Sequence, residues 1–136
     1  MTRAPHDLLT PIREAVAEAI GIDTEEAQPD AALIGDLGAE SLDMLDIMYR
    51  IEGVCGVLLT VDDISDLLQG GIPDEEFADE DEVVNDTGLT HLEKVLPQFD
   101  RSRLTEPLMA DDVLGLFTIR NLVDLVSRRT ALADAA

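Results

Sequence analysis

The fold is decided around the stretch Asp36, Leu37, Gly38, Ala39, Glu40, Ser41, Leu42, Asp43. Residues 21–40 contain Pro29, Gly35 and Gly38 with scattered apolar residues and no sustained periodicity, which predicts a long loop held by apolar contacts. Helical apolar spacing begins directly after Ser41. The sequence therefore predicts that this serine lies at the junction between a glycine turn and the start of a helix.

The predicted helix over residues 42–52 has more than one apolar face. Met44, Ile47, Met48 and Ile51 form one stripe at helical spacing, and Leu42, Leu45 and Tyr49 form a second. A third stripe is charged, and consists of Asp43, Asp46 and Arg50. Because the apolar surface is wider than one core usually covers, we expect part of the second stripe to meet a partner or ligand.

Helical patterns elsewhere predict an all-α fold. Pro11 suits the first position of a helix over residues 11–20, with Thr10 as its cap. Thr60 and Asp63 predict a short helix to about Leu68, and residues 74–82, with seven acids in nine positions, predict a solvated loop. Two later helices are expected, one capped by Thr90 and Glu93 and broken near Pro97, the other beginning after Thr118.

Composition limits the classes of function. The formal charge of −21 repels nucleic acid and anionic membranes and favours partners with basic surfaces. No apolar run approaches the roughly 18 residues that span a bilayer. The length of 136 residues predicts a single domain, and we expect a cytoplasmic monomer.

The sequence offers no recognisable catalytic or metal-binding constellation. The two histidines, His6 and His91, are far from Ser41 in the sequence, and the many acids single out no acid–base pair. The acidic run lacks the ligand spacing and central glycine of a calcium loop. We therefore predict a protein that is not an enzyme and holds no metal.

Residues 36–43 resemble the acyl carrier protein motif, in which an Asp-Leu-Gly turn precedes an acid, Ser, Leu and a second acid. The resemblance continues at Pro29, Asp30 and Ala31, along residues 47–52, and along residues 118–126. It implies an acyl-carrier-like helical bundle in which Ser41 carries a covalent 4'-phosphopantetheine arm. The start of a helix suits the arm's phosphodiester, because its N–H groups are unpaired and its dipole is positive. A serine at this point can also be a simple helix cap.

The resemblance implies a shuttle that carries acyl groups as thioesters between enzymes of fatty acid or specialised lipid or polyketide biosynthesis. Its partners would be a phosphopantetheinyl transferase and acyl-carrier ligases, ketosynthases or acyltransferases with basic docking surfaces. Residues expected to face them are Glu40, Leu42, Asp43, Asp46 and Tyr49. Glu40 departs from the family's usual Asp, so charge is kept but the side chain is longer. An aminoacyl or peptidyl carrier and an unmodified acidic adaptor for basic proteins remain alternatives.

Residues 66–115 are expected to be an insertion within one carrier domain spanning residues 1–136, because the flanks resemble the family and this segment does not. The segment contains 14 acids and three bases, a formal charge of −11. Its apolar residues are sufficient to dock short helices. They would either extend a cavity for a long acyl chain or form a surface that a dedicated enzyme recognises.

Overall fold

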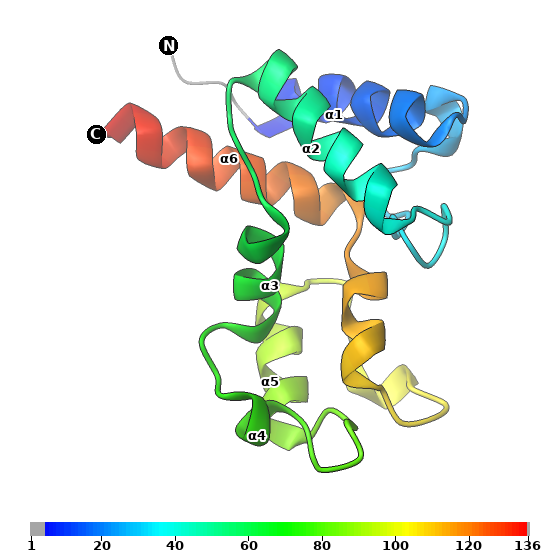
Figure 1. Ribbon diagram of the computed structural model, residues 1–136, viewed down its shortest axis with the longest axis vertical. Helices are drawn as coiled ribbons and strands as arrows, with labels where there is room; N and C mark the ends of the chain where they lie inside the picture. The colour runs from blue at the N-terminus through cyan, green and yellow to red at the C-terminus, as the bar shows by residue number, and fades with distance from the viewer. Residues whose placement is uncertain (1–4, 136) are drawn as a thin grey trace. The chain divides into compact units, whose positions relative to one another are not determined.

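The computed structural model describes residues 5–135 and confirms the predicted all-α class. Within this range the only β-type pairings are isolated bridges, and no strand forms. Figure 1 shows the helices in chain order. The α-helices are α1 (Pro5–Ile20), α2 (Ser41–Cys55), α3 (Val61–Gln69), α4 (Asp74–Phe77), α5 (Asp86–Val95) and α6 (Ile119–Ala135). The 3₁₀ helices are η1 (Thr24–Glu26), η2 (Arg101–Arg103) and η3 (Ala110–Leu116).

The described residues form two compact units. Unit 1 consists of the residues up to Val61 together with those from Phe117 onward, and unit 2 is Asp62–Leu116. Unit 1 contains α1, α2 and α6, and α1 contacts both other helices. The single carrier domain and the insertion at residues 66–115 remain predictions.

The core of unit 1 is mostly aliphatic, as expected from a chain with three Phe and one Tyr, but its largest fully buried side chain is that of Phe117. Its fully buried aliphatic side chains include Ile12 and Val16 of α1, Ile47 and Ile51 of α2, and Leu122 and Val126 of α6. The predicted start of the first helix was wrong. Pro11 lies inside α1, which begins at Pro5, so Thr10 is not its cap. The proline removes one backbone donor, but a buried face that includes Leu8 continues the helix on its N-terminal side.

The predicted loop between α1 and α2 is attached to the start of α6. The backbone N–H of Leu33 donates to Phe117 O at 3.0 Å, and that of Ile119 donates to Ala31 O at 3.1 Å. Thr118 and Asn121 are buried and bond to each other at the beginning of α6, with Thr118 Oγ1 donating to Asn121 Oδ1 at 2.9 Å. These contacts hold the second part of the connection in place, and its only regular element among the described residues is the single turn η1.

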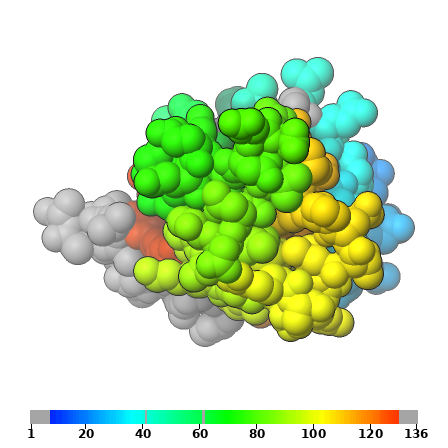
Figure 2. All heavy atoms as spheres, turned by 90° about the horizontal axis from the view of Figure 1, so that it is seen from below, coloured from blue at the N-terminus to red at the C-terminus, as the bar shows by residue number. Residues whose placement is uncertain are grey.

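Unit 2 has its own apolar core. Its residues are coloured green to orange in the space-filling view (Figure 2). The predicted helix ending near Leu68 is confirmed as α3. The acidic stretch 74–82 was predicted as loop only, but its first residues form the single turn α4. The reason is that the buried side chain of Phe77 packs this turn into the core of unit 2. The other core side chains of unit 2 are Ile64, Leu68, Val84, Leu92, Leu96, Leu108 and Val113.

The expected cap at Thr90 was also wrong, because α5 begins at Asp86. Asn85 is its cap, and its side-chain oxygen accepts the N–H of Gly88 at 3.1 Å. The helix ends at Val95, because the ring of Pro97 disfavours helical backbone angles at the preceding residue, Leu96.

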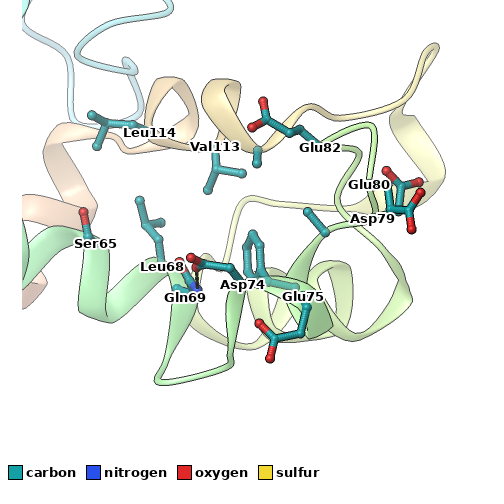
Figure 3. A pocket seen from close by; sticks show the side chains of 13 residues that line it. Ser65, Leu68, Gln69, Asp74, Glu75, Asp79, Glu80, Glu82, Val113 and Leu114 are labelled. Atoms are coloured by element: carbon teal, nitrogen blue, oxygen red, sulfur yellow. Dashed lines mark hydrogen bonds between the residues drawn. The ribbon is translucent and has the colours of Figure 1, made fainter.

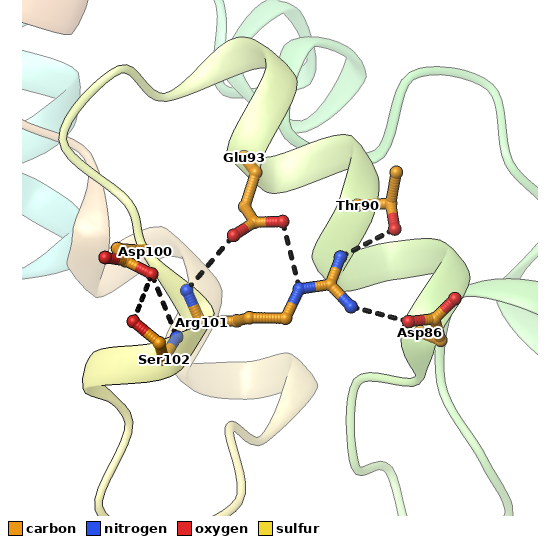
Figure 4. Close-up of polar contacts among 6 residues, drawn as sticks. All are labelled: Asp86, Thr90, Glu93, Asp100, Arg101 and Ser102. Carbon is orange, nitrogen blue, oxygen red and sulfur yellow. Dashed lines mark hydrogen bonds and ion pairs between the residues drawn. The ribbon is translucent and has the colours of Figure 1, made fainter.

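Thr90 and Glu93 instead bind Arg101, which also pairs with Asp86 (Figure 4). The Arg101 Nε donates to Glu93 Oε1 at 2.9 Å. The hydrogen bond to Asp86 raises the pKa of Arg101 above its usual value. On the neighbouring turn, hydrogen bonds from Ser102 lower the pKa of Asp100, so its carboxylate stays charged as the pH falls toward the usual value for Asp. This cluster fastens η2 to α5.

Candidate functional site

The turn before Ser41 is built by backbone bonds and one carboxylate. Asp36 Oδ2 accepts the N–H of Ala32 at 2.7 Å, and the N–H of Asp36 donates back to Ala32 O at 3.0 Å. Gly38 has a φ of 73°, in the left-handed region that side chains disfavour, which explains the glycine in the motif. Ala39 is buried, and its N–H donates to Leu33 O at 2.9 Å. The direction in which the chain enters α2 is thus fixed by contacts within unit 1.

Ser41 is the first residue of α2, and the cap position belongs to Glu40. Asp43 Oδ2 accepts the N–H of Glu40 at 2.9 Å, and the N–H of Met44 donates to Glu40 O at 3.0 Å. The Ser41 side chain lies outside the described part of the structure. Because Glu40 occupies the cap and Asp43 reaches back to it, the position of Ser41 is not that of a capping residue. The alternative explanation of the serine as a cap therefore loses its support.

The two apolar stripes of α2 separate as the sequence predicted. The inner stripe is buried and consists of Met44, Ile47, Met48 and Ile51. On the outer stripe, Leu42 is 77% exposed, Leu45 55% and Tyr49 75%. The outer stripe begins next to Ser41 and continues for two turns of the helix. A large apolar surface of this kind beside a candidate attachment site is typical of a surface that meets other proteins.

The charges next to this stripe are not equivalent, a difference that the sequence pattern did not reveal. Arg50 donates from Nε to Asp46 Oδ1 at 3.1 Å and from Nη1 to Glu18 Oε2 at 2.9 Å. Asp46 is therefore partly neutralised by a cation of its own helix. Asp43 uses one oxygen for the Glu40 N–H but has no ion pair among the described residues. An i, i+4 spacing of acid and base on α2 was the available signal for the Asp46–Arg50 pair.

A family model for the phosphopantetheine attachment site matches residues 10–69, which run from α1 to the end of α3. Acyl carrier proteins are among the similar curated proteins. That of Solidesulfovibrio magneticus is 35% identical over 52 residues, which cover 67% of its length and 38% of this chain. That of Karelsulcia muelleri is 32% identical over 63 residues, which cover 75% of its length and 46% of this chain.

The chain belongs to the acyl carrier protein family. Acyl carrier protein AcpXL of Brucella melitensis is also similar, at 31% identity over 67 residues, which cover 72% of its length and 48% of this chain. No solved structure matches. The family resemblance inferred from residues 36–43 is confirmed, whereas the resemblance of residues 118–126 to the family's last helix lies outside the matched range and stays a prediction.

Family membership establishes the cofactor and the general role of this carrier. The matched region is the phosphopantetheine attachment site of acyl carrier proteins, so the cofactor is 4'-phosphopantetheine. The predicted assignment as a carrier rather than an enzyme is confirmed, and a carrier interacts with biosynthetic enzymes. None of the described helices is long and apolar enough to cross a membrane. The described residues include no group of acids, histidines or cysteines suited to a metal ion.

Proposed function

We propose that Ser41 receives the 4'-phosphopantetheine arm and that this acyl carrier protein shuttles acyl groups between enzymes of fatty acid or specialised lipid or polyketide biosynthesis. In arm transfer, the Ser41 hydroxyl oxygen attacks the phosphorus of coenzyme A that carries the pantetheine and gives up its proton to a base of the transferase. The new phosphodiester bond forms as the pyrophosphate bond breaks, and adenosine 3',5'-bisphosphate leaves. The terminal thiol of the arm then holds the acyl group as a thioester. We also propose that the carrier acts as a cytoplasmic monomer.

The observation that supports Ser41 most directly is its place as the first residue of α2 inside the matched range. The first N–H groups of a helix have no partner within the helix, and the helix dipole is positive there. A phosphodiester on this residue would be stabilised by hydrogen bonds from these N–H groups and by the positive end of the helix dipole. Since the turn and cap are formed by Asp36, Gly38, Glu40 and Asp43, a bulky group on Ser41 would not displace the contacts that start the helix.

The test is transfer of the arm to the full-length protein. We expect incubation with coenzyme A and a phosphopantetheinyl transferase to add one arm, measured by intact mass. A protein that stays unmodified with several transferases of broad specificity would instead be the unmodified adaptor. The mass of the protein purified from its native host reports the cargo, and an aminoacyl or peptidyl group in place of an acyl group would contradict the acyl assignment.

We further propose that partner enzymes bind the surface formed by Glu40, Leu42, Asp43, Asp46 and Tyr49. The exposed apolar side chains offer contact area, and the carboxylates attract basic surfaces such as those expected on a transferase, ligase, ketosynthase or acyltransferase. Asp43 should contribute more to this attraction than Asp46, because Arg50 offsets the charge of Asp46.

Asp43→Asn is therefore expected to slow arm transfer by about threefold to tenfold at low salt, and Asp46→Asn by less. The amide oxygen of the new side chain can still accept the Glu40 N–H, so the substitution removes charge while the helix start is kept. Initial transfer rates at several salt concentrations would measure the effect. The difference from the wild-type rate should decrease as the salt concentration rises, because at 0.1 M salt charges are screened beyond a Debye length of about 10 Å. Glu52→Gln, at an exposed position further along α2, is the matched control.

Equal initial rates for Asp43→Asn and the wild type at low salt would refute a guiding role for Asp43. A larger loss in Asp46→Asn than in Asp43→Asn would show that the Arg50 pair does not mask Asp46. A circular dichroism spectrum of each variant is the check that α2 remains folded.

Residues 66–115 are proposed to be an insertion added to the carrier core. In support, the family match ends at Gln69, and the hydrogen bonds described for the turn and cap around Ser41 join residues of unit 1. The insertion would then affect which enzymes load or unload the carrier, and not whether Ser41 can be modified.

A further inference from the structure

Unit 2 contains a cavity of about 790 Å³, formed by α3, α4, the acidic loop after α4, and η3. Figure 3 shows the side chains of Leu68, Val113 and Leu114 around the hollow. Leu68, Phe77 and Val113 are nearly buried and form its apolar floor. The volume is in the range of sites that enclose a ligand or a few side chains of another protein.

The edge of this cavity is acidic. Asp74, Glu75, Asp79, Glu80 and Glu82 line it, and no Lys, Arg or His is among the lining residues. Two of these carboxylates have structural roles: Asp74 Oδ1 accepts Gln69 Nε2 at 2.6 Å, and Asp79 Oδ1 accepts the N–H groups of Asp81 and Val83 at 2.9 and 3.0 Å. These bonds explain why the loop after α4 keeps its shape.

The other three carboxylates, those of Glu75, Glu80 and Glu82, are exposed and enter no hydrogen bond or ion pair within the described residues. Like charges that line one cavity repel one another, and a cationic ligand would relieve this repulsion. A fatty acid or a phosphate would add to the repulsion. An uncharged acyl chain would make favourable contacts with the apolar floor but none with the carboxylates at the edge.

We propose that this cavity is a docking site for a segment of a partner protein in which an apolar side chain is flanked by Lys or Arg residues. The apolar side chain occupies the floor formed by Leu68, Phe77 and Val113, and the basic residues pair with Glu75, Glu80 and Glu82. Charge complementarity selects this occupant, because a second copy of a chain with a formal charge of −21 would be repelled. All residues that line this cavity belong to unit 2.

The test uses full-length, unmodified protein and a fluorescent helical peptide of about 15 residues in which two Leu are flanked by Lys. We expect binding, measured by fluorescence anisotropy, and about tenfold weaker binding at low salt to the variant with Glu75→Lys and Glu80→Lys. The matched control carries Glu76→Lys and Glu106→Lys, which change the net charge equally at exposed positions of unit 2 outside the cavity lining. Its affinity should fall by less than that of the cavity variant, because the carboxylates it replaces do not line the cavity.

A second peptide, with both Leu replaced by Ser, tests the apolar floor and should bind about tenfold more weakly than the first. Three results would overturn the proposal: no binding of the first peptide, equal losses in the cavity variant and its control, or equal binding of the two peptides. The second result would show a diffuse acidic field, and the third a purely electrostatic contact. Circular dichroism of both variants shows whether unit 2 is still folded.

Discussion

Replacing Ser41 with Ala is expected to abolish arm transfer completely while leaving the carrier folded. The hydroxyl oxygen is the only atom through which this residue could form the phosphodiester, and Ala has none. The helix start should survive, because the cap position belongs to Glu40 and Asp43 accepts its N–H. Removal of a serine that acted as a cap would cost about 0.5–2 kcal/mol, whereas a change at the first helical position should cost less.

Intact mass after incubation with coenzyme A and a transferase measures the modification, and urea unfolding measures the free energy of unfolding. Ser65→Ala is the matched control, since Ser65 is an exposed serine on helix α3. It should accept one arm as the wild type does. An arm on the Ser41→Ala protein, or loss of modification in Ser65→Ala, would move the attachment site away from Ser41.

The sequence predicted α2 well because one short segment combined several independent signals. The glycine at position 38 indicated a turn, and the spacing of Met44, Ile47, Met48 and Ile51 indicated one buried face. The unusual second stripe at Leu42, Leu45 and Tyr49 could be recognised because an outward apolar face has no use in the core of the same unit. Burial confirms both stripes, while the proteins that meet the outer one are still a proposal.

Helix starts were predicted less well because several residues near each start could serve as a cap. Thr90 and Glu93 fit the capping-box pattern, yet Asn85 caps α5 and the two residues bind Arg101 instead. The competing contact comes from a residue later in the chain, which spacing within a short window does not show. The ion pairs of Arg50 illustrate the same limit: the pair with Asp46 is local, but the one with Glu18 comes from α1.

The second large effect is expected at Gly88, where α5 packs on α4. A Cβ at this buried position would lie 2.6 Å from Phe77 O and 2.6 Å from Val84 Cγ1. Phe77 O is a backbone atom that already accepts the N–H of Asn85 at 2.9 Å, so it cannot move without disturbing the start of α5. We expect Gly88→Ala to destabilise unit 2 by about 3 kcal/mol, at the upper end of the usual cost of overpacking.

Gly115→Ala is the matched control in the same unit, because a Cβ there has nothing within 4 Å; it should change the free energy of unfolding by less than about 1 kcal/mol. Urea unfolding and hydrogen exchange along α5 measure the destabilisation.

We expect the Gly88→Ala protein to accept the arm on Ser41 at the wild-type rate, since the turn and cap around Ser41 use contacts from unit 1. Loss of exchange protection in α5 together with loss of arm transfer would place residues 66–115 within the carrier core and reject the insertion hypothesis. Unchanged protection in α5 would reject the steric argument at Gly88.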